Sequence, residues 1–228
     1  MNSIDAVIPA FNAAAYIGEA IASVLAQSPP VSRVIVVDDG STDATASVAE
    51  AFGTPVEVIR LGDNRGAGCA RNAGLAGGSS ALVAFLDADD RWLAGKLAAQ
   101  CAALDADPAA MFALCRMRMF ASPELPPDEQ ALLVAANPSP NEGWSASTLV
   151  ARRELFARAG LFPEDLRIGE VIDWFSRARV YPHMHVEAIG VERRLHRTNT
   201  SRRAPAAQRD YLLAARRHLA RTRGGDSP

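Results

Sequence analysis

Lysine is almost missing from this chain, because only Lys96 among its 24 lysine and arginine residues is a lysine. The cationic side chains are therefore nearly all guanidinium groups, which keep their charge at physiological pH. Schiff-base chemistry needs a lysine in a substrate pocket, and no pattern puts Lys96 in one. Cysteine is also scarce. Cys69, Cys101 and Cys115 are odd in number and lack metal-ligand spacing, so we expect free core thiols in a reducing compartment.

Long hydrophobic runs and glycine-rich phosphate motifs are absent as well. No segment approaches the roughly 18 apolar residues of a membrane span, and the N-terminus lacks the pattern of a signal peptide, so we expect a cytoplasmic protein. The turn at 9–13 has no G-x-G-x-x-G, which disfavours a dinucleotide-dependent dehydrogenase. No G-x-x-x-x-G-K-[ST] occurs either, so P-loop phosphoryl transfer has no support.

Charge is distributed unevenly along the sequence. Residues 1–192 hold 14 basic and 24 acidic side chains, whereas 193–228 hold 10 arginines and two aspartates. We expect the segment 193–223 to contact a phosphate-bearing acceptor or an anionic membrane, and we expect no nucleic-acid partner. An interfacial helix would suit the helical spacing of its apolar side chains, Tyr211, Leu212, Ala215 and Leu219. Two alternatives are that the arginines meet only the acidic body of the protein itself, and that the apolar stripe packs on that body.

Hydrophobic periodicity predicts alternating strands and helices in the first 118 residues. Strands are expected at 4–8, 33–38, 56–61, 81–86 and 111–119, and helices at 16–27, 42–52, 66–75 and 96–104. Nearly continuous apolar strands are typical of a parallel sheet that is covered on both faces. The sequence therefore predicts an α/β fold with a doubly wound, mainly parallel sheet flanked by helices.

The composition changes after this region. Residues 121–145 carry five prolines and little periodicity, which predicts a mobile excursion and not a core element. Strands are expected at 147–150 and 186–191, and helices at 153–159, 170–180 and 205–221. We interpret the chain as one domain of two halves, 1–110 and 111–204, followed by a basic C-terminal helix and tail, 205–228.

Three carboxylates follow the apolar run 81–86, in the sequence Asp87-Ala88-Asp89-Asp90. A parallel strand that ends there brings them to the sheet edge where open α/β folds bind ligands. Crowded oxygen ligands at such an edge suit Mg²⁺ or Mn²⁺ holding a diphosphate. The alternative is that Asp89 and Asp90 only cap a helix that begins near Trp92.

Two other segments reach the same predicted edge. Asp38 and Asp39 end a strand, where they can accept hydrogen bonds from a ribose hydroxyl or a pyrimidine N–H, or else serve a capped helix start. The segment 64–74 has glycines that permit close approach at a helix N-terminus. Arg71 lies one turn inside this helix, where it is expected to point toward a bound nucleotide.

Taken together, P-x-F-N, V-D-D-G-S-T-D, N-x-G-x-x-x-A-R-N-x-G and F-L-D-A-D-D, in this order and spacing, resemble the inverting glycosyltransferases of family 2, which have the GT-A fold. The match is unbroken from residue 4 to about 96 and looser as far as Ser201. It implies a nucleotide diphosphate sugar donor with Mn²⁺ or Mg²⁺. Residues 1–110 are then the nucleotide-sugar-binding half and 111–204 the smaller acceptor-side half.

The resemblance also implies roles for individual residues. Nucleoside contacts are implied for Pro9, Phe11, Asp39 and Arg71, with Asp38 beside them; Asp87 is similar to a sugar or ribose contact, and Asp89 to the metal ligand. His196 resembles a histidine that completes the metal or diphosphate site. His183 and His185, two residues apart near a strand, are expected to be structural.

The general base departs from the family pattern. Such enzymes usually carry Glu-Asp, whose second acid is the base, but Glu170 is followed here by Val171, which cannot take a proton. Glu170 and Asp173 share a helical face and are expected to reach one cavity, with Glu170 as the first candidate. A helix dipole that merely favours Glu170 is the structural alternative.

Two other functions compete with glycosyl transfer. A non-catalytic nucleotide-sugar binding protein is suggested by Val171. A sugar-phosphate nucleotidyltransferase is disfavoured, because its glycine-rich, basic first turn is absent from 9–15. The acceptor remains open between a glycan, a lipid-linked sugar and a small molecule.

Overall fold

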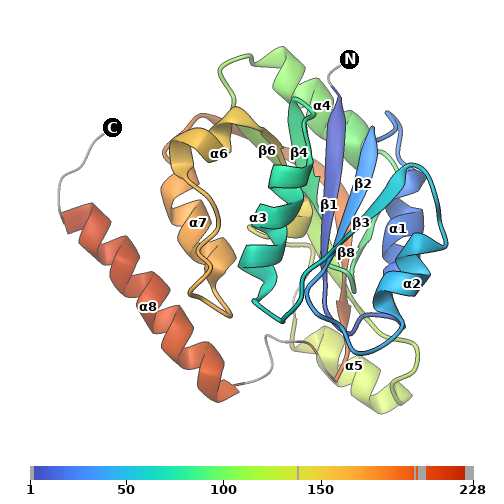
Figure 1. The fold of residues 1–228 in the computed structure, drawn as a ribbon. Coiled ribbons are helices and arrows are strands. Elements are labelled where there is room, and N and C mark those ends of the chain that lie inside the picture. Colours follow the sequence, from blue (N-terminus) through green and yellow to red (C-terminus); the bar gives the residue numbers. More distant parts are fainter. Residues whose placement is uncertain (1–2, 138, 198, 200–203, 224–228) are drawn as a thin grey trace.

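The structure, a computed structural model, describes residues 3–137, 139–197, 199 and 204–223, and within this part the strands form one sheet of eight in the order β3-β2-β1-β4-β7-β6-β8-β5 (Figure 1). The strands are β1 (Ile4–Ala10), β2 (Arg33–Asp38), β3 (Val56–Arg60), β4 (Leu82–Phe85), β5 (Arg91–Trp92), β6 (Phe112–Ala121), β7 (Leu149–Arg152) and β8 (His183–Leu195). The helices are α1 (Ile17–Leu25), α2 (Thr45–Glu50), α3 (Ala67–Gly77), α4 (Lys96–Ala106), α5 (Pro127–Ala135), α6 (Glu154–Ala159), α7 (Glu170–Ala178) and α8 (Ala204–Arg223), with a 3₁₀ turn η1 (Ala146–Thr148).

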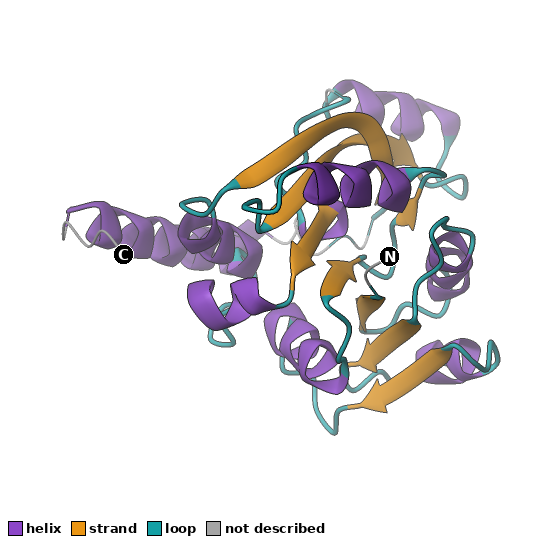
Figure 2. Cartoon of the chain, turned by 90° about the horizontal axis from the view of Figure 1, so that it is seen from above, coloured by secondary structure: helices purple, strands orange, loops and turns teal. Residues whose placement is uncertain are grey.

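Parallel pairing joins β3, β2, β1 and β4, so their carboxyl ends meet at one edge. Buried residues of α1, α2 and α4 pack on one face of the sheet, and those of α3, α6 and α7 on the other, as the view along the layers shows (Figure 2). This arrangement confirms the predicted α/β fold with helices on both faces. Gly74 lets α3 approach β1 closely, because a Cβ at this position would lie only 2.3 Å from Val7 Cγ1.

The second half extends the sheet in mixed orientation. β7 is antiparallel to both β4 and β6, β8 is parallel to β6, and β5 pairs antiparallel with β8. Arg91 faces Glu192 across the β5–β8 pair. The last residues of β8 therefore lie beside the loop that follows β4, although more than 100 residues separate the two segments in sequence.

Two expectations about local structure were wrong. Arg91 and Trp92 form a strand, and α4 begins only at Lys96, after Gly95 with φ 83°, so Asp89 and Asp90 cap no helix there. The region 121–145 contains α5, whose first turn carries a proline, where no N–H is needed. Leu133 of this helix packs with Leu125 and Leu195.

The C-terminal helix α8 lies against α7 at the periphery (Figure 1). Ala214 is buried, whereas Leu212 and Leu219 are 61% and 49% exposed and Ala215 is exposed too. The expected alternative, in which this stripe packs on the body, is therefore wrong for these three residues; the side chain of Tyr211 is outside the described part. No described helix has the length and apolar character that crossing a bilayer requires.

Ion pairs, not apolar packing, hold much of α8. Arg217 pairs with Asp165 and Arg221 Nη2 lies 3.0 Å from Asp173 Oδ1. Asp210 accepts the backbone N–H of Arg167 at 2.9 Å. Because these partners lie on and before α7, they fix α8 to that helix.

A buried carboxylate joins the elements at the edge where the parallel strands begin. Asp5 is 0% exposed and accepts the N–H groups of Ser79 and Ser80 at 2.8 Å each. Arg33 Nε lies 3.3 Å and Arg153 Nη2 2.7 Å from its oxygens. Burial raises the pKa of Asp5, but the hydrogen bonds from Ser80 and the charge of Arg33 outweigh it, so its pKa is lowered.

Lys96 is also fully buried. Its Nζ donates to Gln100 Oε1 at 2.8 Å and lies 4.2 Å from the centre of the Trp92 ring. Burial lowers the pKa of Lys96 to about 8. Its neighbours Cys101 and Cys115 are free thiols, as is Cys69.

Candidate functional site

The loops at the carboxyl edge are tied together by two acids. Asp39 accepts the N–H of Arg65 at 2.8 Å and that of Gly66 at 2.7 Å, and it is 3% exposed. Asp38 accepts the N–H of Ser41 at 3.1 Å and is also buried. Gly40 has φ 74°, and a Cβ there would lie 2.8 Å from the Asp63 carbonyl carbon. Both acids thus shape the edge, and their contact with a nucleotide remains a prediction.

Pro9 and Phe11 lie where β1 ends. Pro9 is buried in the strand, whereas Phe11 is 46% exposed just beyond it. Asn12, with φ 49°, receives the N–H of Thr42 at 2.9 Å and so locks this turn to the loop after β2. An exposed ring on a fixed turn offers a flat apolar surface at the ligand edge.

Arg71 links two acids from different halves of the chain. Its Nη2 lies 2.6 Å from Asp87 Oδ1 and its Nη1 2.6 Å from Glu170 Oε1. Burial lowers the pKa of Arg71, but Asp87 and Glu170 outweigh it and raise the value. The Arg71 side chain is 4% exposed and its guanidinium is directed to these carboxylates, while its contact with a nucleotide remains a prediction. Its Nε has no hydrogen-bond partner in the described part of the chain.

Asp89 is the centre of a second group of contacts. His196 Nε2 lies 2.9 Å and Asn199 Nδ2 3.1 Å from Asp89 Oδ2. Asn199 Oδ1 also accepts the His196 N–H at 2.6 Å, which fixes the turn after β8. The structure thus brings together the two residues that the sequence predicted as metal ligands. Asn199 was not predicted, although it lies in the segment that contains His196.

Asp90 turns away from this group into the protein. It accepts Ser147 Oγ and the Arg194 N–H, each at 3.0 Å, and is 3% exposed. Burial raises the pKa of Asp90 well above its usual value, and the Asp89 and Asp87 carboxylates raise it further. Asp90 therefore connects β8 to the loop after β4.

Arg194 and Tyr16 support the histidine. The Tyr16 and His196 rings are 4.8 Å apart, and the Arg194 guanidinium lies 5.0 Å from the Tyr16 ring. Arg194 Nε donates to the Asp89 carbonyl at 3.0 Å, and the guanidinium pairs with Glu19. Sequence reasoning missed Tyr16, Glu19 and Arg194, because their contacts join the start of α1 to the end of β8.

The two candidate bases on α7 have different partners. Glu170 is 7% exposed and bound to Arg71, whereas Asp173 contacts Arg177 at 3.3 Å and Arg221 at 3.0 Å. Asp173 thus helps to anchor α8, and the two carboxylates pair with different arginines, while their reach into one cavity remains a prediction. Val171 is partly buried against the core on this face. Only Glu170 joins the group that contains Arg71 and Asp87.

The donor set around Asp89 fits a divalent ion. A carboxylate oxygen and an imidazole nitrogen at one point suit Mn²⁺, and a carboxylate with phosphate oxygens suits Mg²⁺. No cluster of three or more His, Cys, Asp or Glu side chains that could hold a metal occurs among the described residues. The remaining ligands would therefore come from water or a bound diphosphate.

Comparisons with known proteins agree with this architecture. The family model described as "Glycosyl transferase family 2" matches residues 5–145, which is more than half of the chain. The putative teichuronic acid biosynthesis glycosyltransferase TuaG of Bacillus subtilis is 39% identical over 100 residues, covering 42% of this chain. The chain spans 40% of the length of TuaG.

Two solved structures share the fold. S. aureus TarS (residues 1–349) in complex with UDP superposes with a TM-score of 0.77 at 21% identity, over 99% of this chain and 67% of that one. The mannosyltransferase PcManGT from Pyrobaculum calidifontis, in complex with GDP-Man and Mn²⁺, gives 0.72 at 22% identity, over 100% and 66%. At these identities the likeness concerns the fold, which is of the GT-A type. The family match, which covers more than half of the sequence, shows that the chain belongs to glycosyl transferase family 2.

Proposed function

We propose that this protein transfers a hexosyl group from a nucleotide diphosphate sugar to an acceptor hydroxyl, with inversion and with a divalent metal ion. The observation that carries the proposal is the meeting of Asp89, His196 and Asn199 at the edge where Asp87 also lies. Family membership supports it, as do the UDP of TarS and the GDP-Man and Mn²⁺ of PcManGT.

The donor half supplies the nucleotide contacts in this proposal. The exposed Phe11 ring stacks on the base beside Pro9, and Asp39 uses its remaining lone pairs for a base or ribose donor, with Asp38 behind it. Asp87, whose side chain is 34% exposed, accepts from a ribose or sugar hydroxyl. Arg71 orients Asp87 through their 2.6 Å ion pair and is the remaining proposed contact of the nucleoside.

Asp89 and His196 would hold Mn²⁺ or Mg²⁺ on the donor. A bound divalent ion neutralises the charge that develops on the departing diphosphate. Asn199 orients the Asp89 carboxylate through its 3.1 Å hydrogen bond. Tyr16 and Arg194 keep the imidazole in place.

Glu170 is the proposed general base. Its Oε1 is held by Arg71, while its second oxygen has no hydrogen bond within the described part. A carboxylate fixed in this way is oriented to take the proton of an attacking hydroxyl. The alternative is a protein that binds nucleotide sugars without transfer, and Val171 in place of the usual acid is the observation that favours it.

Calorimetric titration separates these roles. UDP-glucose, UDP-GlcNAc and GDP-mannose are each titrated with Mn²⁺ and with EDTA. We expect one of them to bind at least about tenfold more tightly with Mn²⁺. Asp89→Ala should lose this difference, whereas Asp165→Ala, whose carboxylate pairs with Arg217, should keep it. Equal affinity with and without the metal would overturn the metal assignment, and no transfer to any acceptor despite donor binding would favour the non-catalytic alternative.

We also propose that α8 contacts the anionic inner face of a membrane that carries a lipid-linked acceptor. Leu212 and Leu219 are exposed on a helix that also exposes Arg209 and Arg216, which is the pattern of an interfacial helix. Co-sedimentation with phosphatidylglycerol vesicles should be salt-sensitive and should weaken in Leu212→Glu, compared with Leu132→Glu on α5. A helix that binds no vesicles at low salt would contradict this contact.

A further inference from the structure

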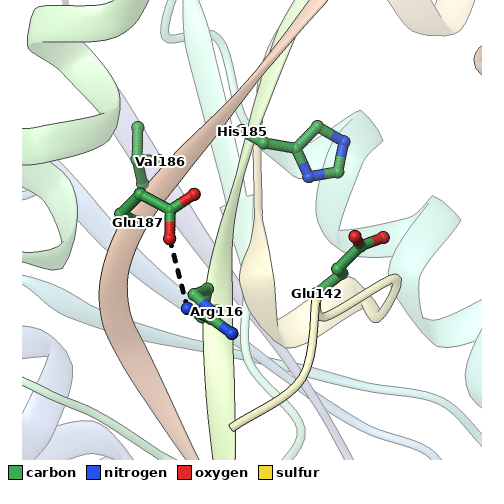
Figure 3. Close-up of a pocket in the computed structure, with 5 residues that line it drawn as sticks. All are labelled: Arg116, Glu142, His185, Val186 and Glu187. Atoms are coloured by element: carbon green, nitrogen blue, oxygen red, sulfur yellow. Dashed lines mark hydrogen bonds and ion pairs between the residues drawn. The ribbon is translucent and has the colours of Figure 1, made fainter.

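A pocket of about 240 Å³ lies beside β6 and β8, and Asp89 is not among its lining residues (Figure 3). Its lining residues are Arg116, Glu142, His185, Val186 and Glu187. The close-up shows Glu142 coming from the loop opposite the two strands. None of these residues belongs to the donor site described above.

An irregularity in strand pairing builds this pocket. Cys115 pairs with Val186, but the next residue, Arg116, pairs with Ile189, so Glu187 and Ala188 have no partner on β6, and a second shift leaves Gly190 without one. Such a bulge redirects side chains at a sheet edge. Here it brings Glu187 Oε2 to 3.2 Å from Arg116 Nη1.

The polar groups of the pocket are of mixed sign. Arg116 is the cation, Glu142 and Glu187 are acids, and His185 adds a ring with a donor and an acceptor nitrogen. The excess of acids disfavours a phosphate or another anion. The Arg116–Glu187 pair is solvent-exposed, with the Glu187 side chain 90% exposed, so it has little strength of its own and can reorganise around a ligand.

Trp144 adjoins the pocket through His185, with ring centres 5.3 Å apart. Its other ring contacts are Phe175 and His183, at 5.1 and 5.6 Å. All three rings are inclined to the indole by 59–88°, so none of them stacks parallel to it. His183, in contrast, stacks on Phe112 at 7°, which fits the structural role expected for it.

Exposure distinguishes this tryptophan from the others. Trp144 is 41% exposed, whereas Trp92 and Trp174 are 3% and 0% exposed. A large exposed ring beside a pocket is a common mark of a binding surface. The apolar face of a pyranose complements an indole face, and its hydroxyls need the donors and acceptors that the pocket provides.

We propose that Trp144 with Arg116, Glu142, His185 and Glu187, the Trp144 pocket, is a second carbohydrate-binding site for a neutral oligosaccharide. Metal binding is an unsuitable alternative, since no metal-holding cluster occurs among the described residues. Along β6, Leu114 beside His185 and Phe120 beside Arg194 are six residues apart, which is about 20 Å of strand. If the proposed transfer holds, the pocket retains a distal part of an extended acceptor glycan while the hydroxyl at its end reaches the sugar of the bound donor.

Tryptophan fluorescence tests the binding directly. Cellotetraose, maltotetraose, laminaritetraose and chitotetraose are titrated without nucleotide or metal, and acrylamide quenching is followed. We expect at least one tetrasaccharide to protect Trp144 in a saturable way below about 10 mM. Trp144→Ala should abolish the protection. Arg116→Met and Glu142→Gln should weaken calorimetric binding by about tenfold, while Leu132→Ala on α5 should leave it unchanged.

Each outcome decides the proposal. The proposal is overturned if none of the four tetrasaccharides binds in a saturable way. It is also overturned if Trp144→Ala and Arg116→Met bind them in calorimetry as tightly as the wild type does. Donor binding is measured separately on the same samples. Donor binding without tetrasaccharide binding rejects the Trp144 pocket alone, and tetrasaccharide binding without any donor binding rejects the proposed transfer but retains the pocket.

Discussion

At the edge where the parallel strands begin, a carboxylate is surrounded by arginines, and at the opposite edge an arginine is held between carboxylates. Asp5 with Arg33 and Arg153 forms the first cluster, and Arg71 with Asp87 and Glu170 forms the second. Both are buried ion-pair groups that join the two halves of the chain. They differ in what their acids still expose.

Asp5 is 0% exposed, and its oxygens receive backbone, hydroxyl and guanidinium donors. In the second cluster the Asp87 side chain is 34% exposed and Glu170 has an oxygen without a described partner. We therefore call the Asp5 cluster closed, because its carboxylate is fully buried and bonded. We call the Arg71 cluster open, because its acids keep oxygens that a ligand can reach. A closed cluster can only stabilise the fold, whereas an open one can also act on a ligand.

The largest expected effect concerns the open cluster. Glu170→Gln should keep donor affinity and reduce transfer by roughly 10²–10⁴-fold, because it removes the proton acceptor. Asp173→Asn, on the same helix, should cost much less, since Asp173 pairs with Arg177 and Arg221. Steady-state kinetics on both variants measure this.

Val171→Asp provides an independent control. It restores an acid at the position where family members usually have their base. A large gain in turnover would show that Glu170 is not a competent base in the natural chain. A more damaging effect of Asp173→Asn than of Glu170→Gln would also contradict the assignment.

Opening the closed cluster should affect stability. Asp5→Asn should lower the free energy of unfolding by about 3 kcal/mol at pH 7, because it removes the buried charge that pairs with the partly buried Arg33 and Arg153. The Asp5 pKa is lowered in the fold, so its contribution is complete above its usual pKa of 3.8 and is lost as pH falls through the folded value. Urea unfolding between pH 7 and pH 3 should show a smaller loss of stability in the variant than in the wild type, because carboxylates such as Glu19 and Asp165, whose pKa values are also lowered, contribute in both proteins. We also expect each folded Asp5→Asn molecule to transfer sugar at the same rate as the wild type.

Exchanging arginine for lysine compares the clusters under identical chemistry. Arg71→Lys cannot bridge two carboxylates with a planar fork, so transfer should fall by about 10²-fold. Arg153→Lys at the closed cluster should cost about 1 kcal/mol of stability and leave transfer unchanged. Kinetics and thermal unfolding on both variants give the two readouts. A loss of transfer in Arg153→Lys would remove the distinction between the clusters.

The last expected effect concerns Lys96, a buried charge with no carboxylate partner in the described part of the chain. Its pKa falls from 10.5 to about 8 in the fold, so the unfolded chain holds more protons between these values and stability should rise with pH in this window. Lys96→Met should remove that rise and stabilise the protein at pH 7 by at most about 3 kcal/mol. Urea unfolding at pH 7 and pH 9.5 tests it. An identical pH dependence in both proteins would assign the rise to other groups.

Local patterns predicted the donor half well. Arg33–Asp38 was predicted to the residue, because a continuous apolar strand between polar turns has no competing interpretation. β8 was predicted far too short, since its polar residues at 183, 185 and 192–194 hide the strand pattern. Prolines hid α5, because only their place in the first turn makes them compatible with a helix.

The site divides in the same way. Sequence motifs brought Asp89 and His196 into one prediction, and the structure places them 2.9 Å apart. The partners of Glu170 and Asp173 were beyond reach, because Arg71 precedes Glu170 by 99 residues and Arg221 follows Asp173 by 48. Helical spacing alone says which side chains share a face, but not which charges meet them there.

Lys96 gives this protein an unusual covalent chemistry. The chain has one lysine, and that lysine is 0% exposed between Trp92 and Gln100. Amine-directed reagents therefore meet no lysine on the folded surface and can modify this side chain only when the core around α4 opens. The rate at which an amine-directed reagent modifies Lys96 would therefore measure how often this part of the core opens, without an engineered probe.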